Sequence, residues 1–113
     1  MSAAHIWKNG SFIAWNDANV HITTHALHYG SSAFEGIRAY ATPDGPQVFR
    51  LSPHMKRLMN SCKIARMDLS YTLEELNQAV VDTVAINGHD ACYIRPIALR
   101  GAGPLGVEGR KNP

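Results

Sequence analysis

Residues 52–88, SPHMKRLMNSCKIARMDLSYTLEELNQAVVDTVAING, contain two helical patterns in succession, and the fold class follows from them. Ser52 is the expected N-cap of the first helix. Pro53 then takes the first helical position, where a missing N–H is no loss. Apolar residues recur at helical spacing down to about Arg66 and predict one buried face. They are Met55, Leu58, Met59 and Cys62.

The second helix begins with a capping box. Thr72 and Glu75 can each satisfy the other's backbone N–H, and Gly88 is a natural stop after the last apolar position. The apolar face of this helix consists of Leu73, Leu76, Val80 and Val84. Two amphipathic helices in a row need a common apolar surface, which the flanking segments must supply.

Short strand patterns flank the two helices. Upstream, Asn9-Gly10 is the preferred dipeptide of a type I′ hairpin turn, and residues 43–46 (PDGP) predict a second turn. Pro96 lies within the apolar segment that follows the helices, which implies an edge strand or a bulge there. The expected strands are residues 6–8, 11–15, 20–22, 33–40, 47–50 and 91–99. This order predicts an α+β fold, a mainly antiparallel sheet with two helices on one face.

Composition excludes several classes of protein. The chain has 113 residues, 45% of them hydrophobic and 18% charged, which is typical of one globular domain. A net charge of +2 is too small for a nucleic-acid binder. Two cysteines do not make a disulfide framework, and no apolar run is long enough to span a membrane. We therefore expect a cytoplasmic protein with no nucleic-acid or membrane partner.

Residues 1–100 carry all of the helical and strand patterns, so we expect them to form the folded domain. Residues 101–113 hold four of the nine glycines and two of the six prolines. That composition predicts a loop or the start of a linker, and we expect the chain to be part of a longer protein.

Two apparent motifs fail on their context. Residues 101–106 match G-x-G-x-x-G, but Pro104 prevents the helix that a dinucleotide site requires. His21, His25 and His28 have spacings that a helix could turn into a zinc site, yet the surrounding residues predict no helix. We interpret these histidines as hydrogen-bonding groups in a structured turn and expect no metal.

Tyr93 and Arg95 are two residues apart on an expected strand, so their side chains project to the same face. An arginine in an apolar strand needs a carboxylate or phosphate partner, which can be a ligand or a protein acid such as Glu35. Arg57, in the first helix, has a simpler alternative, a solvated surface position. Taken singly, neither arginine indicates a function.

Together these residues resemble a known signature. The segments THALHYG (24–30), FEGIR (34–38), HMKRL (54–58), YIRP (93–96) and GV (106–107) occur in the order and spacing of branched-chain amino acid aminotransferases. That family uses pyridoxal 5′-phosphate and has fold type IV. The resemblance covers nearly the whole chain and implies that it is the small N-terminal domain, followed by a large cofactor domain.

The resemblance implies a role for individual residues. Arg57 matches the arginine that grips the cofactor phosphate. Arg95 matches the arginine that meets the side-chain carboxylate of glutamate, and Tyr93 lines the pocket beside it. Phe34 and Gly36 match pocket walls, an aromatic one and one that allows close approach.

Tyr29 and Val107 match substrate-site residues that reach into the neighbouring subunit, which implies a homodimer or a larger homo-oligomer. The signature histidines and Glu35 receive no chemical role. The family's covalent lysine lies beyond residue 113, and none of the lysines here occupies its position. These lysines are Lys8, Lys56, Lys63 and Lys111. We therefore expect no catalytic residue in this chain, and no activity from it alone.

The implied activity is transfer of an amino group between leucine, isoleucine or valine and 2-oxoglutarate. Amino acids and 2-oxo acids are then the small-molecule partners. Two alternatives stay open. One is a D-amino-acid or (R)-amine transaminase of the same fold, and the other is a non-catalytic assembly module, suggested by the missing lysine.

Overall fold

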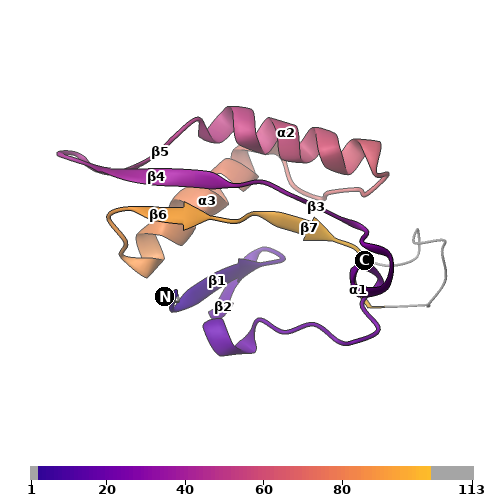
Figure 1. Ribbon diagram of the computed structural model, residues 1–113. Coiled ribbons are helices and arrows are strands. Elements are labelled where there is room, and N and C mark those ends of the chain that lie inside the picture. The colour runs from indigo at the N-terminus through magenta and orange to yellow at the C-terminus, as the bar shows by residue number, and fades with distance from the viewer. Residues whose placement is uncertain (1–2, 103–113) are drawn as a thin grey trace.

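Two long helices follow a series of short strands, as the sequence predicts, and two more short strands follow the helices (Figure 1). The computed structural model describes residues 3–102. The strands are β1 (His5–Lys8), β2 (Ser11–Ala14), β3 (Ser32–Phe34), β4 (Ile37–Thr42), β5 (Gly45–Val48), β6 (Cys92–Ile94) and β7 (Ile97–Leu99). The helices are α1 (His25–Tyr29), α2 (Leu51–Ile64) and α3 (Leu73–Asn87), and a 3-10 turn, η1, spans Trp15–Asp17.

Every strand pairing within residues 3–102 is antiparallel, which confirms the expected fold class. The strands form three small sheets, β1-β2, β3-β7 and β5-β4-β6, rather than one. The N-terminal hairpin turns at Asn9 and Gly10, both with positive φ, as a type I′ turn requires. The turn after β4 reaches Gly45, also at positive φ.

Two of the expected strands are each divided in two. Residues 33–40 become β3 and β4, and residues 91–99 become β6 and β7. At the break, the Glu35 N–H donates to the Pro96 carbonyl oxygen over 3.0 Å, but proline has no N–H to return. The flanking pairs are Phe34 with Ile97 and Ile37 with Ile94. The two residue numbers of each pair add to the same value, as they must in antiparallel strands of constant register. The register therefore continues through the break, and no bulge is present at Pro96.

Helix α2 begins one residue before Ser52, so the N-cap prediction is wrong. The N-cap is Arg50, at a left-handed φ of 52° and without a side-chain hydrogen bond to the helix. Pro53 falls in the first turn, where its absent N–H still needs no partner. At the other end, Arg66 is left-handed, and the Met67 N–H donates 2.8 Å to the Cys62 carbonyl oxygen. This is a Schellman end.

Helix α3 confirms the capping box. The Glu75 N–H donates to Thr72 Oγ1 at 3.2 Å, and the Thr72 N–H donates to Glu75 Oε1 at 3.0 Å. Gly88 ends the helix in the left-handed region, as expected. Asn87, in the last turn, bonds the backbone of His5 in both directions and also accepts from Ala4 N–H. It ties β1 to α3.

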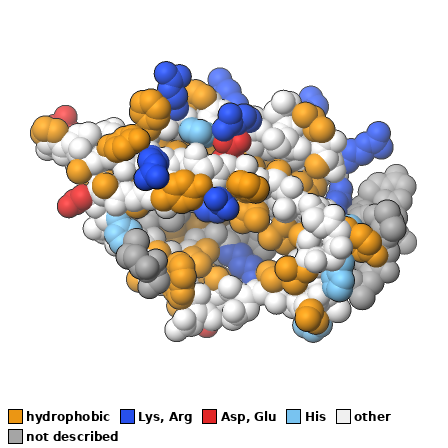
Figure 2. All heavy atoms as spheres, in the orientation of Figure 1, with side chains coloured by type: hydrophobic (Ala, Val, Ile, Leu, Met, Phe, Trp, Pro, Cys, Tyr) orange, Lys and Arg blue, Asp and Glu red, His pale blue; other side chains and the backbone are white. Residues whose placement is uncertain are grey.

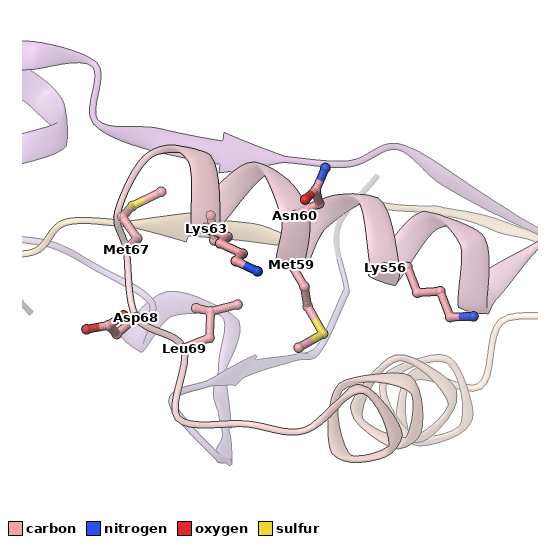
Figure 3. Close-up of a pocket in the computed structure, with 8 residues that line it drawn as sticks. Lys56, Met59, Asn60, Lys63, Met67, Asp68 and Leu69 are labelled. Atoms are coloured by element: carbon pink, nitrogen blue, oxygen red, sulfur yellow. The ribbon is translucent and has the colours of Figure 1, made fainter.

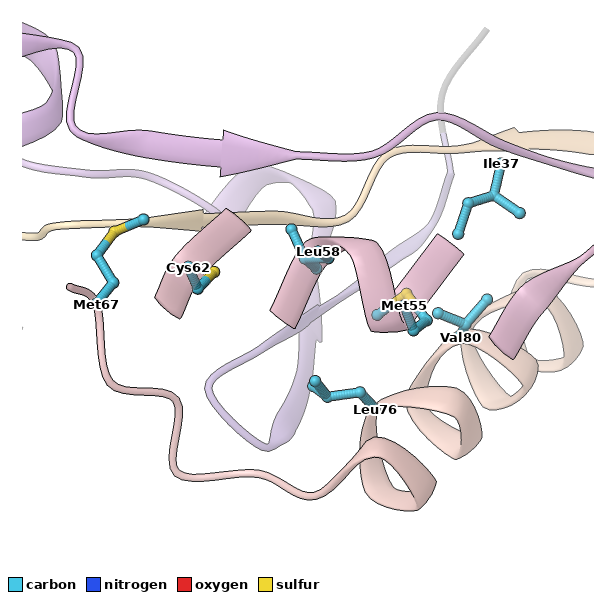
Figure 4. Packing of buried hydrophobic residues seen from close by; sticks show 7 residues of the cluster. All are labelled: Ile37, Met55, Leu58, Cys62, Met67, Leu76 and Val80. Carbon is cyan, nitrogen blue, oxygen red and sulfur yellow. The ribbon is translucent and has the colours of Figure 1, made fainter. Parts of the chain in front are cut away.

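The core lies between the helices and the inner face of the sheets (Figure 4). Helix α2 packs against α3 and β3, and α3 packs against β1. The buried cluster consists of Ile37, Met55, Leu58, Cys62, Met67, Leu76 and Val80. Most of the predicted apolar faces of both helices are therefore confirmed.

Residues 20–22 form no strand, so the strand predicted there is wrong. Residues 25–29 form the short helix α1, so the prediction of no helix around the histidines is also wrong. Ile22 is 75% exposed and has no sheet face to cover. Its neighbour Thr24 is buried instead, because it turns the chain and pairs with Ala102. Gly30, at a φ of 66°, ends α1 after little more than one turn. Within residues 3–102, no helix is both long and apolar enough to cross a membrane.

Candidate functional site

Four of the predicted site residues lie on one exposed face of the sheets. Because side chains alternate along extended backbone, Phe34 and Gly36 share the outer face of the β3–β4 path. Tyr93 and Arg95 share the outer face of the β6–β7 path beside it. Figure 2 shows hydrophobic and cationic side chains interspersed over this region. We call these four residues the sheet face.

The Arg95 guanidinium joins the aromatic residues of the sheet face. Its Nη2 donates to the Tyr93 hydroxyl at 2.9 Å, and its Cζ lies 4.5 Å from the Phe34 ring centre. Arg38 approaches the same tyrosine from β4, with Cζ 5.6 Å from the ring centre. Two cations beside exposed aromatic rings suit a ligand that has both a carboxylate and an apolar part. The prediction that Tyr93 and Arg95 face the same way is confirmed.

Gly36 is required for space rather than for backbone conformation, since its φ is not positive. A Cβ at this position would overlap the Tyr93 hydroxyl oxygen and would lie 3.1 Å from Cζ. The Tyr93 ring therefore lies directly across the glycine. Close approach does occur here, and the group that approaches is a side chain of the protein itself.

Arg57 lies on α2 and is bound by Glu35, whose side chain leaves the chain on the inner face. Arg57 Nε donates to Glu35 Oε2 at 2.8 Å, and Arg57 Nη2 donates to Oε1 at 2.6 Å. His54 Nδ1 donates to the same Oε1 at 2.9 Å. The interpretation that Glu35 partners Arg95 is therefore wrong, as is that of Arg57 as a purely solvated residue.

The Glu35 carboxylate is held in its charged form. The hydrogen bonds from Arg57 lower its pKa most, and His54 lowers it further, to about 2, although burial acts in the opposite direction. The same pairing raises the pKa of Arg57. At neutral pH the site therefore contains a buried anion that neutralises the charge of the arginine.

Arg57 retains the capacity to bind a phosphate. Its side chain is 67% exposed, whereas that of Glu35 is 5% exposed, so the ion pair has one buried and one open side. Glu35 takes two of the five guanidinium N–H groups, and no other partner of Arg57 is found within residues 3–102. The free donors on an anchored, exposed guanidinium fit the phosphate of a cofactor such as pyridoxal 5′-phosphate.

The other two predicted residues are not joined to this arrangement. Tyr29 lies in α1, where its ring packs on His25 with the ring centres 4.5 Å apart. Val107 lies outside the described residues. The predicted roles of both in a neighbouring subunit therefore remain predictions.

The histidines of this region hydrogen-bond as the sequence suggests. His25 Nδ1 lies 2.7 Å from Ser31 Oγ, and His28 Nε2 donates to the Ile22 carbonyl oxygen at 2.8 Å. His21 bonds the hydroxyl and N–H of Thr23. In the described part of the chain, no group of three or more metal-ligating side chains could hold an ion.

Sequence reasoning assigned no role to Glu35 and His54. Two signals were available. Glu35 alternates with the outward residues Phe34 and Gly36, so its charge must point inward and needs partners. His54 and Arg57 are three apart on α2, so both face one side of the helix.

A separate hollow of about 380 Å³ lies between α2 and residues 67–69 (Figure 3). Its walls include Lys56, Asn60 and Lys63, on a side of α2 that carries neither His54 nor Arg57. No predicted site residue lines it. Its location gives no reason to include it in the site.

Comparisons with known proteins connect this geometry to a family. The family model of amino-transferase class IV matches residues 32–113, more than two thirds of the chain. The chain belongs to this family.

Relatives share both sequence and fold with the chain. The branched-chain-amino-acid aminotransferases of Salmonella typhimurium strain LT2 and Escherichia coli strain K12 are each 47% identical over 105 residues. The match covers 93% of this chain and 34% of each relative. The chain thus spans about one third of their length.

Solved structures agree. The T.th. branched-chain amino acid aminotransferase, complexed with N-(5′-phosphopyridoxyl)-L-glutamate, has a TM-score of 0.96 at 48% identity. That match covers 99% of this chain and 38% of the other. The enzyme from Thermobaculum terrenum, in its PLP form, gives a TM-score of 0.85 at 30% identity, over 97% of this chain and 37% of the other. The resemblance and the fold predicted from sequence are confirmed.

Proposed function

We propose that this chain is the N-terminal part of a branched-chain aminotransferase that uses pyridoxal 5′-phosphate. The observation that carries the proposal is the pair of adjacent residues Glu35 and Gly36, whose side chains face opposite sides of the sheets. Glu35 holds Arg57, which has free N–H groups for a phosphate, and Gly36 lies beneath the Tyr93 ring on the sheet face. The named relatives and the complex with a phosphopyridoxyl glutamate support the same assignment.

In this function, the residues of the chain would bind and orient the cofactor and the substrate. Arg57 would hold the cofactor phosphate through its free N–H groups. Arg95 would pair with the side-chain carboxylate of glutamate and would return to the Tyr93 hydroxyl when leucine binds. Phe34 and Tyr93 would contact the aliphatic side chain. The bound cofactor supplies the electron sink of transamination.

The proton-transferring lysine would come from the part of the protein beyond this chain. Lys8 donates to the Asn19 carbonyl oxygen, and Lys56 and Lys63 face the hollow beside α2. None of these three lies on the sheet face. We therefore propose residues 1–100 as the small domain and 101–113 as the connection to a larger cofactor domain. Residues 1–113 alone should be inactive.

The remaining proposals concern the environment of the whole protein. Tyr29 and Val107 would complete the substrate site of a neighbouring subunit, in a homodimer or larger homo-oligomer. The protein would act in the cytoplasm, on free amino acids and 2-oxo acids. The net charge of +2 and the presence of two cysteines are compatible with that location.

Arg95 provides the test, with the full-length protein. Arg95→Gln should lower kcat/KM for glutamate at least about tenfold, or about 1.4 kcal/mol, because the ionic partner of the substrate carboxylate is lost. The loss for leucine should be clearly smaller. Arg50→Gln is the matched control, since the Arg50 guanidinium lies over the ring of Phe49, which is not one of the four residues of the sheet face.

Equal losses for glutamate and leucine would show that Arg95 supports the Tyr93 ring only. Turnover of D-amino acids or (R)-amines, without turnover of leucine, would replace the proposal by the first alternative. A wild-type protein that binds pyridoxal 5′-phosphate and transaminates none of these substrates would contradict the proposed reaction. An absence of cofactor binding would favour the assembly module.

A further inference from the structure

Glu35 is buried and is bound on both oxygens of its carboxylate. It lies at the break between β3 and β4, and its own N–H is fixed by the Pro96 carbonyl oxygen. Its side chain is nearly inaccessible and accepts three hydrogen bonds, two from Arg57 and one from His54. An acid held in this way is an anchor, because it has no freedom to follow a moving partner.

The two donors come from one rigid element. His54 and Arg57 are three residues apart in the first turns of α2, and α2 packs against β3. The fork of Arg57 meets both carboxylate oxygens, which fixes the plane of the guanidinium as well as its position. An exposed arginine without such a partner would sample many rotamers and would lose that freedom when it bound a ligand.

We propose that Glu35 is a positioning residue for the cofactor phosphate, and that it acts by fixing the guanidinium of Arg57 before the phosphate arrives. His54 donates to Oε1 of the same carboxylate and so helps to hold Glu35 in place. This inference rests on the proposed function, because it takes Arg57 as the phosphate ligand.

Charge alone predicts the opposite effect. A carboxylate next to the phosphate site repels a phosphate dianion, so removal of its charge would tighten binding if electrostatics decided the outcome. If instead the affinity depends on Arg57 being fixed before the phosphate binds, removal of the Glu35 charge weakens binding. The sign of the change in affinity therefore separates the two effects.

The test uses the full-length apoprotein, titrated calorimetrically with pyridoxamine 5′-phosphate. This probe carries the phosphate and forms no covalent bond with a lysine. Glu35→Gln should raise its Kd at least tenfold, because an amide retains one acceptor oxygen for a fork that needs two. Glu74→Gln is the matched control, since Glu74 is exposed on α3, and it should change Kd less than twofold.

A double-mutant cycle checks that Glu35 acts through Arg57. Arg57→Ala should weaken binding more than Glu35→Gln does, and the double variant should match Arg57→Ala within twofold. Losses that multiply would show that Glu35 supports the fold independently of Arg57, and would overturn the proposal. An unchanged or lower Kd for Glu35→Gln would also overturn it.

His54 provides a second route if Glu35→Gln does not fold. His54→Ala should weaken binding at least threefold, whereas His54→Gln, which can still donate to Glu35, should stay within twofold of wild type. Equal Kd values for these two variants and wild type would overturn the role of His54 as the holder of the carboxylate.

The outcomes for the proposed function are distinct. If wild type binds the probe but does not transaminate leucine, only the proposed reaction fails, and the Kd comparison still decides the role of Glu35. If wild type does not bind the probe, Arg57 is not a cofactor ligand, and the proposal for Glu35 falls.

Discussion

The contact between Gly36 and Tyr93 predicts a defined cost for one added methyl group. In Gly36→Ala, the new Cβ would overlap the Tyr93 hydroxyl and would lie 3.1 Å and 3.3 Å from the ring atoms Cζ and Cε2. The ring must turn outward, which its half-exposed position allows. The Arg95 hydrogen bond and the ring contact with Arg38 would then be lost.

The magnitude follows from these two contacts. One hydrogen bond contributes about 0.5–1.5 kcal/mol. One exposed cation–π contact adds about 0.5–1 kcal/mol. We therefore expect Gly36→Ala to lower the local stability of β4 and β6 by about 1–2.5 kcal/mol. Native-state hydrogen exchange of the full-length protein, followed on peptides from these two strands, measures this quantity directly.

Tyr93→Phe identifies the source of the cost. It removes the overlapping oxygen, so it should cost little or nothing in the Gly36→Ala background, although it costs the Arg95 hydrogen bond in wild type. Gly45→Ala is the control, because a Cβ there meets no atom within 4 Å and only the positive φ is strained. The stability losses of Gly45→Ala and Tyr93→Phe should add in the double variant. A neutral Gly36→Ala, or additivity with Tyr93→Phe, would refute the overlap.

Two further predictions concern the scaffold, and both can be checked by the same hydrogen exchange. Arg66→Gly should stabilise the end of α2 by about 0.5–1 kcal/mol. Arg66 has a left-handed φ of 57°, which glycine adopts without the strain that a Cβ causes. Arg66→Ala should give no gain, and an equal gain would contradict the backbone explanation. Asn87→Leu should destabilise β1 by about 2–3 kcal/mol, since it removes the hydrogen bonds to Ala4 and His5. Asn60→Leu, at an exposed position of α2, should be nearly neutral, and a comparable loss there would contradict the role of Asn87.

Local rules predicted the features that depend on neighbouring residues alone. The Asn9-Gly10 turn and the capping box of Thr72 are confirmed, because each is complete within four residues. Ser52 shows the limit of such rules. It is a good cap in isolation, but α2 begins one residue earlier, at Leu51, and its N-cap is the left-handed Arg50, two residues after the end of β5.

The features that sequence reasoning missed depend on segments far apart in the chain. The break in residues 33–40 is caused by Pro96, about sixty positions away, which has no N–H to offer to its partner strand. The partner of Glu35 is also distant in sequence. Arg95 projects to the opposite face of the sheets, and the packing of α2 against β3 brings Arg57 to Glu35 instead.

Glu35 and Gly36 are adjacent in an unbroken register, so a single peptide unit fixes the distance between them. Adjacent Cα atoms are about 3.8 Å apart whatever the side chains. Covalent bonds therefore set the spacing between the residue that holds Arg57 and the residue that lies under the Tyr93 ring. Substitutions around the site can reshape its walls without altering that spacing. Insertion of a single residue would turn Glu35 outward and Gly36 inward, and would exchange the two faces at once. At this step, the site tolerates a change of chemistry far better than a change of length.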